Sequence, residues 1–315
     1  MPRQTVLVTG AGGLVGSALV PALLALDHDV AVVDRMPDRL EQFAAHADSG
    51  RVRTFHVDVT DAGSIADAVA VTRPRAIVHL AALHFIPECE AQPQRTVETN
   101  IDGLANVLTA ADRAGTEFVV FASTADVYAP SAEALAEGDP ARPSTVYGAT
   151  KLLGERLVAE WADSAPGRRA TSLRIFNVYG PADRNPHVIP DILDGLLRGG
   201  EIRVGNTEPR RDFIHVEDLA ELLCRVLAAA DPPAVVNAGT GLTASVAELL
   251  GILQKLVDDP FAWSSDPAKV RQVDRFCLRA NTSRLRSAFP GFQPRGVETG
   301  LGDVLTALGF PVGAV

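Results

Sequence analysis

Along the first 175 residues, short apolar runs alternate with stretches whose apolar residues recur at helical spacing. The apolar runs cover residues 5–8, 30–33, 52–57, 76–80, 118–121 and 171–175. The helical stretches include residues 14–26, 64–71, 101–114 and 149–161. Nearly continuous apolar strands are typical of a sheet that is covered on both faces. The alternation therefore predicts an α/β fold with a doubly wound parallel sheet.

After about residue 175 this rhythm loosens, and proline and glycine become denser. Helical spacing returns in residues 216–230 and 245–257. With 315 residues the chain is long enough for two lobes. We predict a dinucleotide-binding domain over residues 1–175 and a smaller α/β substrate lobe over residues 176–315. We expect segments around residues 212–238 to return to the first domain.

The composition limits the classes of partner and compartment. A formal net charge of -10 argues against a general binder of nucleic acid or of anionic membranes. The three cysteines, Cys89, Cys224 and Cys277, are far apart and form no metal-binding cluster. We therefore expect no disulfide scaffold, no metal site and a location in the reducing cytoplasm.

The stretch from Thr5 to Leu26 contains no charged residue, which superficially suits a membrane span or a signal peptide. However, four glycines are clustered in its middle and Pro21 follows them. Clustered glycines are typical of a tight loop, so we expect a strand, a loop and a helix here and no membrane segment.

The glycines of this loop have the spacing of a Rossmann-type dinucleotide site. Gly10 permits a sharp turn, Gly13 permits backbone amides to approach a pyrophosphate, and Gly16 permits close packing of the following helix. The helix start at Leu14 and Val15 adds partial positive charge beside the phosphates. A glycine-rich turn without a ligand is the alternative, but the flanking strand and helix favour the dinucleotide.

Asp34 ends the next strand, where an acidic residue binds the adenosine ribose. Its carboxylate would accept both ribose hydroxyls and repel a 2′-phosphate, so NAD is favoured. The adjacent Arg35 leaves NADP open. Asp58 and Val59 follow the third strand, where they would hold the adenine; an ordinary aspartate before a helix is an equal alternative for Asp58.

Tyr147 and Lys151 are four residues apart and therefore share one face of a helix. An ammonium at about 4 Å, at an effective dielectric near 20, contributes about 4 kcal/mol, or about three pKa units. We therefore expect Lys151 to lower the pKa of Tyr147 and to prepare it for proton transfer. A tyrosine and a lysine on an exposed helix surface are the alternative for this pair considered alone.

Two hydroxyl residues, Ser123 and Thr124, end a buried strand at the edge where such sheets bind ligands. Thr124 is predicted to hydrogen-bond the reacting oxygen, with Ser123 as support; capping of the next turn is the alternative. Asn100 is a further candidate for the active site, and the alternative is that it only caps the N-terminus of a helix. His79 is better interpreted as a hydrogen-bonded core histidine.

Together these motifs resemble the extended short-chain dehydrogenase/reductase superfamily, in its NAD-dependent epimerase/dehydratase family. The matching segments are residues 9–16 (TGxxGxxG), 79–82 (HxAA), 100–103 (NxxG), 123–124, 147–151 (YxxxK), 173–181 (LRxFNVYGP) and 211–219 (RDFIHVxDL). The resemblance covers nearly the whole chain.

The resemblance implies NAD as cofactor and a nucleotide sugar, UDP- or dTDP-linked, as substrate. It adds Leu80, Ala81, Ala82 and Asn100 to the cofactor site. The residues that it places around the nucleotide sugar are Asn177, Val188, Val204, Arg211 and Arg271. His84 and His187 are expected to reach the substrate, with surface or structural histidines as the alternative. A homodimer is implied, in which residues 101–114 and 149–161 form a four-helix bundle.

One departure from the family pattern concerns the chemistry. Related 4,6-dehydratases share an Asp-Glu pair at the positions of Ala125 and Asp126. Ala125 leaves the position of the acid empty. Asp126 has a shorter side chain than the glutamate of the relatives but could still act. Our hypothesis is a nucleotide-sugar 4-epimerase that passes through a transient 4-keto sugar. A dehydratase or decarboxylase using Asp126 is the first alternative. A dehydrogenase or ketoreductase and a non-catalytic NAD-sensing regulator are further alternatives.

Overall fold

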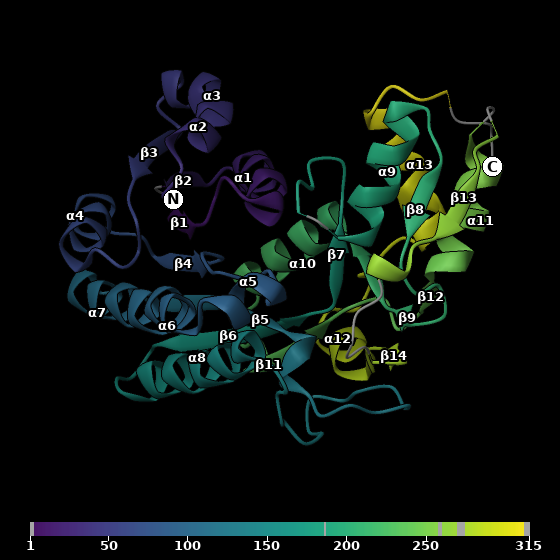
Figure 1. Ribbon diagram of the computed structural model, residues 1–315. Helices are drawn as coiled ribbons and strands as arrows, with labels where there is room; N and C mark the ends of the chain where they lie inside the picture. Colours follow the sequence, from purple (N-terminus) through teal and green to yellow (C-terminus); the bar gives the residue numbers. More distant parts are fainter. Residues whose placement is uncertain (1–2, 186, 258–259, 270–274, 312–315) are drawn as a thin grey trace.

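The computed structural model describes residues 3–185, 187–257, 260–269 and 275–311. Its centre is a seven-stranded, wholly parallel sheet in the order β11-β6-β5-β4-β1-β2-β3 (Figure 1). The strands are β1 (Thr5–Thr9), β2 (Asp29–Asp34), β3 (Val52–His56), β4 (Ala76–His79), β5 (Phe118–Thr124), β6 (Arg169–Ile175) and β11 (Val235–Ala238). The predicted doubly wound α/β fold is confirmed.

Helices cover both faces of this sheet. They are α1 (Leu14–Ala25), α2 (Pro37–Leu40), α3 (Ala44–Asp48), α4 (Ala62–Thr72), α5 (Ile86–Ala91), α6 (Pro93–Val97), α7 (Gly103–Ala114), α8 (Val146–Asp163), α10 (Val216–Ala228) and α12 (Ser283–Ala288). One core joins α1 and α10 to the sheet through residues such as Leu19 and Leu222. A second core, which includes Ile65, Leu104 and Val158, joins α4, α7 and α8 to the other face. Strands buried on both faces explain the continuous apolar runs.

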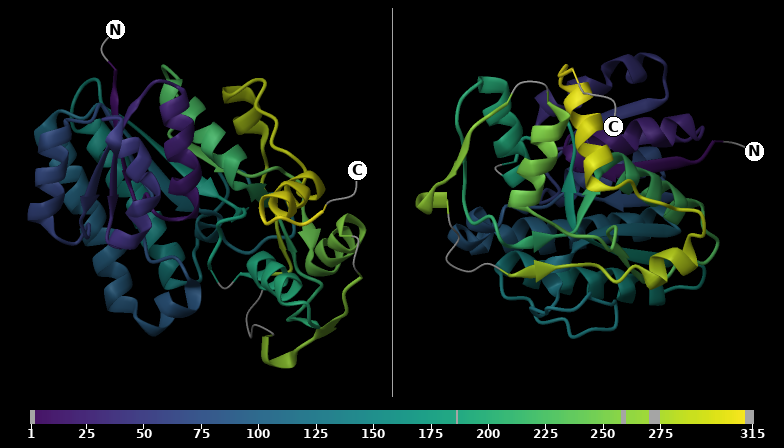
Figure 2. Two further views of the ribbon diagram at one scale, coloured as in Figure 1. Left: turned by 90° about the horizontal axis from the view of Figure 1, so that it is seen from above. Right: turned by 90° about the vertical axis from the view of Figure 1, so that its right-hand side faces the viewer.

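A second lobe contains α9 (Val188–Arg198), α11 (Val246–Leu256) and α13 (Val297–Ala307). Figure 2 shows these helices gathered beside the sheet. Their shared core includes Ile192, Leu249 and Leu301. The short strands around them are β7 (Asn177–Tyr179), β8 (Ile202–Val204), β9 (Arg210–Arg211), β10 (Phe213–His215), β12 (Ala244–Ser245), β13 (Trp263–Ser265) and β14 (Cys277–Leu278).

The chain returns from the second lobe to the first. Helix α10 packs against α1, and β11 pairs with β6 at the edge of the main sheet. The buried carboxylate of Asp212 fixes the neighbouring connections, because it accepts hydrogen bonds from the amides of Thr240, Gly241 and Ala280 and from the Thr240 hydroxyl, at 2.7–3.1 Å. Four donors on one carboxylate compensate its burial.

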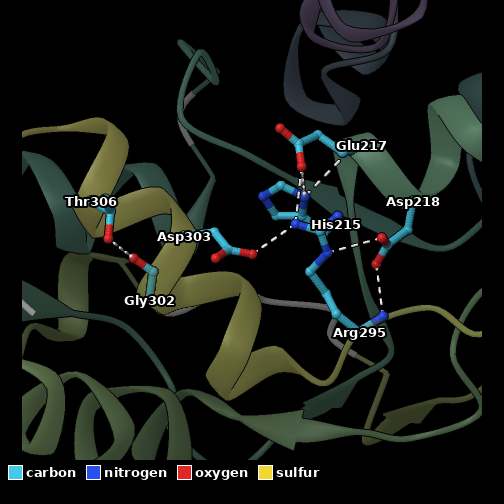
Figure 3. A network of polar contacts seen from close by, with 7 residues as sticks. All are labelled: His215, Glu217, Asp218, Arg295, Gly302, Asp303 and Thr306. Atoms are coloured by element: carbon cyan, nitrogen blue, oxygen red, sulfur yellow. Dashed lines mark hydrogen bonds and ion pairs between the residues drawn. The ribbon is translucent and has the colours of Figure 1, made fainter. Parts of the chain in front are cut away.

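Arg295 fastens the C-terminal segment to α10 (Figure 3). Its backbone amide and Nε each donate to one carboxylate oxygen of Asp218, at 2.8 and 2.9 Å. Its Nη1 donates to Glu217 and to Asp303 of α13, at 3.0 and 2.7 Å. Since the Asp218 side chain is only 7% exposed, the fork of Arg295 supplies the positive charge that this buried carboxylate needs.

The uncharged stretch forms β1, a loop and α1, as expected. No helix among the described residues is long and apolar enough to cross a membrane. Two local features differ from the sequence interpretation. Two short helices, α5 and α6, were not predicted; each has a proline in its first turn, which suits a helix start. A π-helical turn, Glu98–Asp102, precedes α7 in the stretch expected to be regular helix.

Candidate active site

The loop between β1 and α1 requires glycine at two positions. Gly10 has φ +67°, and a Cβ there would lie 2.7 Å from the amide nitrogen of Ala81. A Cβ on Gly16 would overlap the backbone of Ala11. Helix α1 begins after Gly13 without a side-chain cap. The first-turn amides, which include those of Leu14 and Val15, are thus available to an anion, so this loop fits the pyrophosphate of a dinucleotide.

Asp34 lies buried at the end of β2, beside this loop. Its two carboxylate oxygens accept hydrogen bonds from the amides of Gly12 and Met36, both at 3.0 Å. Each oxygen keeps a further lone pair for a ribose hydroxyl. The Asp34 carboxylate therefore shapes the loop and suits the predicted ribose contact. The neighbouring Arg35 is exposed.

The predicted adenine residues lie at the end of β3. Asp58 is exposed, and its Oδ1 accepts hydrogen bonds from the amide and hydroxyl of Thr60. The aspartate that caps the following helix α4 is Asp61. Val59 is buried against Gly103, where a Cβ would lie 2.6 Å from the Val59 methyl. An adenine contact for Asp58 and Val59 stays a prediction.

His79 is a core residue, as expected. Its Nδ1 lies 2.8 Å from Thr9 Oγ1, its ring stacks on Phe121, and burial lowers its pKa to about 3. The same Thr9 hydroxyl accepts the amide of Ala81 at 3.3 Å. Leu80, Ala81 and Ala82 follow as half-buried residues next to Gly10. This strand end therefore lies against the dinucleotide loop.

Asn100 is buried and uses its amide within the protein. Its Oδ1 accepts the amide of Leu83 at 2.8 Å, and its Nδ2 donates to the Leu83 carbonyl and to Thr150 Oγ1 at 2.9 and 3.0 Å. The N-cap alternative is wrong, because Asn100 lies inside the π-helical turn. Both amide hydrogens are engaged, so Asn100 holds the loop after β4 on α8. Its contact with NAD stays a prediction.

Thr124 ends β5 and faces the catalytic candidates. Its hydroxyl accepts the amide of Asp126 at 3.2 Å and lies 3.5 Å from Asp126 Oδ2. The same hydroxyl lies near Tyr147, whose pKa its hydrogen bonding lowers. Thr124, Asp126 and Tyr147 therefore form one cluster at the carboxyl end of the sheet.

Ser123 is directed away from this cluster. Its hydroxyl donates to Glu155 Oε1 at 2.5 Å, and Glu155 forms a buried two-bond ion pair with Arg174. This bond ties β5 to α8 next to Thr124. The expected role of Ser123 as support for Thr124 stays a prediction.

The side chain of Lys151 is buried between β5 and α8. Its Nζ donates to the Ala122 carbonyl at 2.7 Å, 4.7 Å from the centroid of the Phe121 ring and 5.9 Å from that of Tyr147. Burial lowers the pKa of Lys151 to about 7. The ammonium is therefore anchored to the strand on the phenol's side of the helix.

The pKa of Tyr147 is raised, chiefly by burial and secondly by the charge of Asp126, against the opposing hydrogen bond with Thr124. The expectation that Lys151 lowers this pKa is therefore wrong for this structure. The i, i+4 spacing placed the two residues on one face, but the ammonium bonds the Ala122 carbonyl, and burial is the largest cause of the shift in the pKa of the phenol.

The predicted nucleotide-sugar residues lie on the second lobe. Asn177 begins β7, Val188 begins α9, and the buried Val204 ends β8. Arg211 in β9 donates from Nη1 to the carbonyls of Arg210 and Arg275, at 2.9 and 2.8 Å. Arg271 lies outside the described residues.

His84 and His187 meet across the two lobes. Their ring centroids are 6.3 Å apart, and His84 Nε2 lies 3.2 Å from Asn185 Oδ1. Asn185 Nδ2 donates to Asp183 at 2.7 Å, so the Asn185 oxygen is the acceptor and His84 the donor. The sequence indicated the two histidines but not Asn185, which joins His84 to the second lobe.

Arg275 is a further residue of the site that sequence reasoning missed. Its Nη2 donates to the Tyr128 carbonyl at 2.9 Å and lies 4.0 Å from Asp126 Oδ1. Only its closeness in sequence to Arg271 could have drawn attention to it.

The sheet, the glycine loop and the cluster at the end of β5 together define a class of protein, an enzyme that uses a nicotinamide dinucleotide.

A family model described as "NAD dependent epimerase/dehydratase family" matches residues 6–239. The chain belongs to this family, and NAD is its cofactor. It is 30% identical over 315 residues to the UDP-glucose 4-epimerase of Lacticaseibacillus casei, covering 92% of each chain.

Solved structures agree with this assignment. MoeE5 in complex with UDP-glucuronic acid and NAD superposes with a TM-score of 0.85 at 30% identity, over 96% of this chain and 99% of the other. TunA, an NAD-dependent NDP-hexosamine 5,6-dehydratase involved in tunicamycin biosynthesis, gives a TM-score of 0.83 at 26% identity, over 98% of both chains.

Proposed function

We propose that the protein is a nucleotide-sugar 4-epimerase that acts on a UDP-linked hexose through a transient 4-keto sugar. The observation that carries the proposal is the cluster of Thr124, Tyr147 and Asp126 at the carboxyl end of β5, next to the glycine loop. The names of the relatives, UDP-glucose 4-epimerase among them, support the substrate class.

The chain's own groups supply proton transfer and orientation. The phenol of Tyr147 takes the proton of the sugar 4-hydroxyl and later returns it, while Thr124 hydrogen-bonds the same oxygen as its charge changes. Lys151, fixed by the Ala122 carbonyl, supplies positive charge on the phenol's side when it is protonated. The chemistry that bound NAD would supply is the removal of a hydride from a sugar carbon and its return.

Residues of the second lobe bind the nucleotide diphosphate. Arg211 is held in β9 through the carbonyls of Arg210 and Arg275, and its planar guanidinium suits phosphate oxygens. Asn177, Val188 and Val204 lie on the same lobe. The hydrogen bond between His84 and Asn185 joins the first lobe to it.

The proposal is tested with the purified protein and UDP-glucose, dTDP-glucose and GDP-mannose. Chromatography should show conversion of a UDP-hexose to its 4-epimer without net consumption of NAD. Tyr147→Phe should lose at least about 100-fold in kcat while keeping its bound dinucleotide. Full activity of Tyr147→Phe, or no interconversion of any of these sugars, would contradict the proposal.

A dehydratase or decarboxylase is the second candidate, because Asp126 lies against Thr124 and influences Tyr147. Its carboxylate could remove a second proton after oxidation at carbon 4. Mass spectrometry of the product distinguishes an isomer from a sugar that has lost water or carbon dioxide. Steady reduction of added NAD would instead indicate a dehydrogenase or ketoreductase.

We also propose a homodimer formed by α7 and α8. Leu153 on α8 is 48% exposed and Val97, at the end of the neighbouring α6, is 44% exposed. The family resemblance supports this assembly, and burial of these two apolar side chains would add to its stability. Light scattering should give a dimer that Leu153→Glu converts to a monomer; a monomeric wild-type protein at micromolar concentration would refute this assembly.

A further inference from the structure

One nitrogen of the Arg275 guanidinium, Nη1, has no acceptor among the residues that the structure describes. The Arg275 side chain is 13% exposed, and its Nη2 is engaged by the Tyr128 carbonyl. Its Nη1 is buried. A guanidinium stays charged at every physiological pH, so a buried donor of this kind is costly unless something supplies an acceptor.

Arg275 also lies between Arg211 and the cluster around Thr124. Its backbone carbonyl accepts Arg211 Nη1 at 2.8 Å, so its main chain adjoins the residue predicted to bind the diphosphate. Its side chain reaches in the other direction, to 4.0 Å from Asp126 Oδ1, and Asp126 adjoins Thr124. A nucleotide sugar that reaches from Arg211 to the cluster around Thr124 would place its sugar beside Arg275.

We propose that Arg275 is a substrate-contacting residue whose Nη1 donates a hydrogen bond to an oxygen of the sugar. This inference rests on the proposed function and deepens it, because it names the sugar as what Arg275 recognises. The contact with Tyr128 fixes one arm of the guanidinium, so the other arm is held in place before the ligand arrives. A donor fixed in advance loses little conformational freedom on binding.

The charges around Arg275 indicate a neutral sugar. The carboxylate of Asp126, 4.0 Å away, already balances the guanidinium. The side chain of Asp126 is 24% exposed and faces the position proposed for the sugar. A sugar carboxylate would gain attraction from Arg275 but meet repulsion from Asp126, whereas a hydroxyl oxygen accepts the Nη1 hydrogen bond without that cost.

Calorimetry on the NAD-loaded protein tests the inference with two ligands, UDP-glucose and UDP. Arg275→Gln removes the donor fork and should raise the Kd of UDP-glucose about tenfold or more, as expected for a lost bond to a charged donor. The Kd of UDP should stay within about twofold, because UDP lacks the sugar. Arg275→Lys should fall between Arg275→Gln and the wild type, and it serves as the second variant if Arg275→Gln does not fold.

Arg75→Gln is the matched control. Arg75 forms an exposed ion pair with Glu117 at the start of β4, at the opposite end of the sheet from the site. This variant should bind both ligands like the wild type. UDP-glucuronate is the third ligand: a loss for Arg275→Gln that is confined to UDP-glucuronate would overturn recognition of a neutral sugar.

Two other results would overturn the inference. Equal weakening of UDP and UDP-glucose would mean that Arg275 acts only through the support of Arg211, and unchanged affinity for both would mean that it touches neither. These outcomes leave the proposed function intact wherever the wild type still interconverts UDP-hexoses. A wild-type protein that binds UDP-glucose without epimerising it would contradict the proposed function alone, and the binding comparison would still decide the role of Arg275.

Discussion

The ammonium nitrogen of Lys151 lies 2.7 Å from the carbonyl oxygen of Ala122 and 5.9 Å from the centre of the Tyr147 ring. The lysine is thus hydrogen-bonded to the C-terminal part of strand β5 and not to the phenol four residues before it. Its side chain is 3% exposed, and this burial brings its pKa to about 7. A charge held in such a place has consequences for stability as well as for catalysis.

Replacing Lys151 by methionine should stabilise the fold near neutral pH. The folded-state pKa of about 7 lies below the unfolded value of about 10, so the unfolded chain binds more protons between these pH values. The free energy of unfolding of the wild type therefore rises with pH through this window. The gain from Lys151→Met should be about 4 kcal/mol at pH 7 and less than about 1 kcal/mol at pH 10.

Urea unfolding of both proteins at several pH values between 6 and 10 measures this difference. Lys255→Met, on the exposed side of α11, is the control and should show no pH-dependent gain. A constant difference between Lys151→Met and the wild type across the range would refute the buried ammonium. Lys151→Met should lose catalytic activity despite its stability.

Asp126→Asn should move the acid limb of the pH profile of kcat/KM to lower pH. The charge of Asp126 raises the pKa of Tyr147, so its removal lets the phenol ionise more easily. The profile is measured for the wild type, Asp126→Asn and the remote exposed variant Asp38→Asn, which should match the wild type. A shift toward higher pH would show that Asp126 itself is the base.

Asp34→Asn should weaken NAD binding by about tenfold and narrow the preference for NAD over NADP. The carboxylate accepts the amides of Gly12 and Met36, and an amide group offers only one acceptor oxygen to these two donors. Loss of the charge also removes repulsion of a 2′-phosphate. Fluorescence titration with both dinucleotides measures the effect, and an unchanged ratio of the two affinities would argue against a ribose contact.

Arg295→Gln should lower the free energy of unfolding by about 2–3 kcal/mol, because it leaves the buried carboxylate of Asp218 without its positively charged partner. Arg225→Gln on the same helix as Asp218 removes an exposed pair with Glu221 and should cost less than about 1 kcal/mol. Chemical denaturation compares the two variants. Similar losses would show that the contacts of Arg295 in Figure 3 contribute no more than a surface ion pair.

The parts of the molecule that follow local rules were predictable from sequence. Apolar runs specified the central strands, and the positive φ at Gly10 follows from the glycine requirement of a tight turn. Because ligands gather at the carboxyl ends of parallel strands, the sites of Asp34 and Thr124 could also be placed.

Contacts between distant segments could not be predicted in this way. The partner of Ser123 is Glu155, 32 residues away, and the approach of Arg275 to Asp126 depends on how the second lobe packs on the first. Helical spacing placed Lys151 near Tyr147, but the choice of the Ala122 carbonyl depends on the side-chain conformation and on burial. Those quantities come from three-dimensional packing and leave no pattern in the sequence.

The return of α10 and β11 to the main sheet limits how this protein can be taken apart. A fragment that stops at residue 175 would lack the helix that covers α1 and would leave β6 as an unpaired edge, which favours aggregation. An exchange of substrate lobes between relatives therefore needs cuts on both sides of residues 216–238. For protein engineering, the two lobes are interleaved along the chain and are not two consecutive segments joined by a linker.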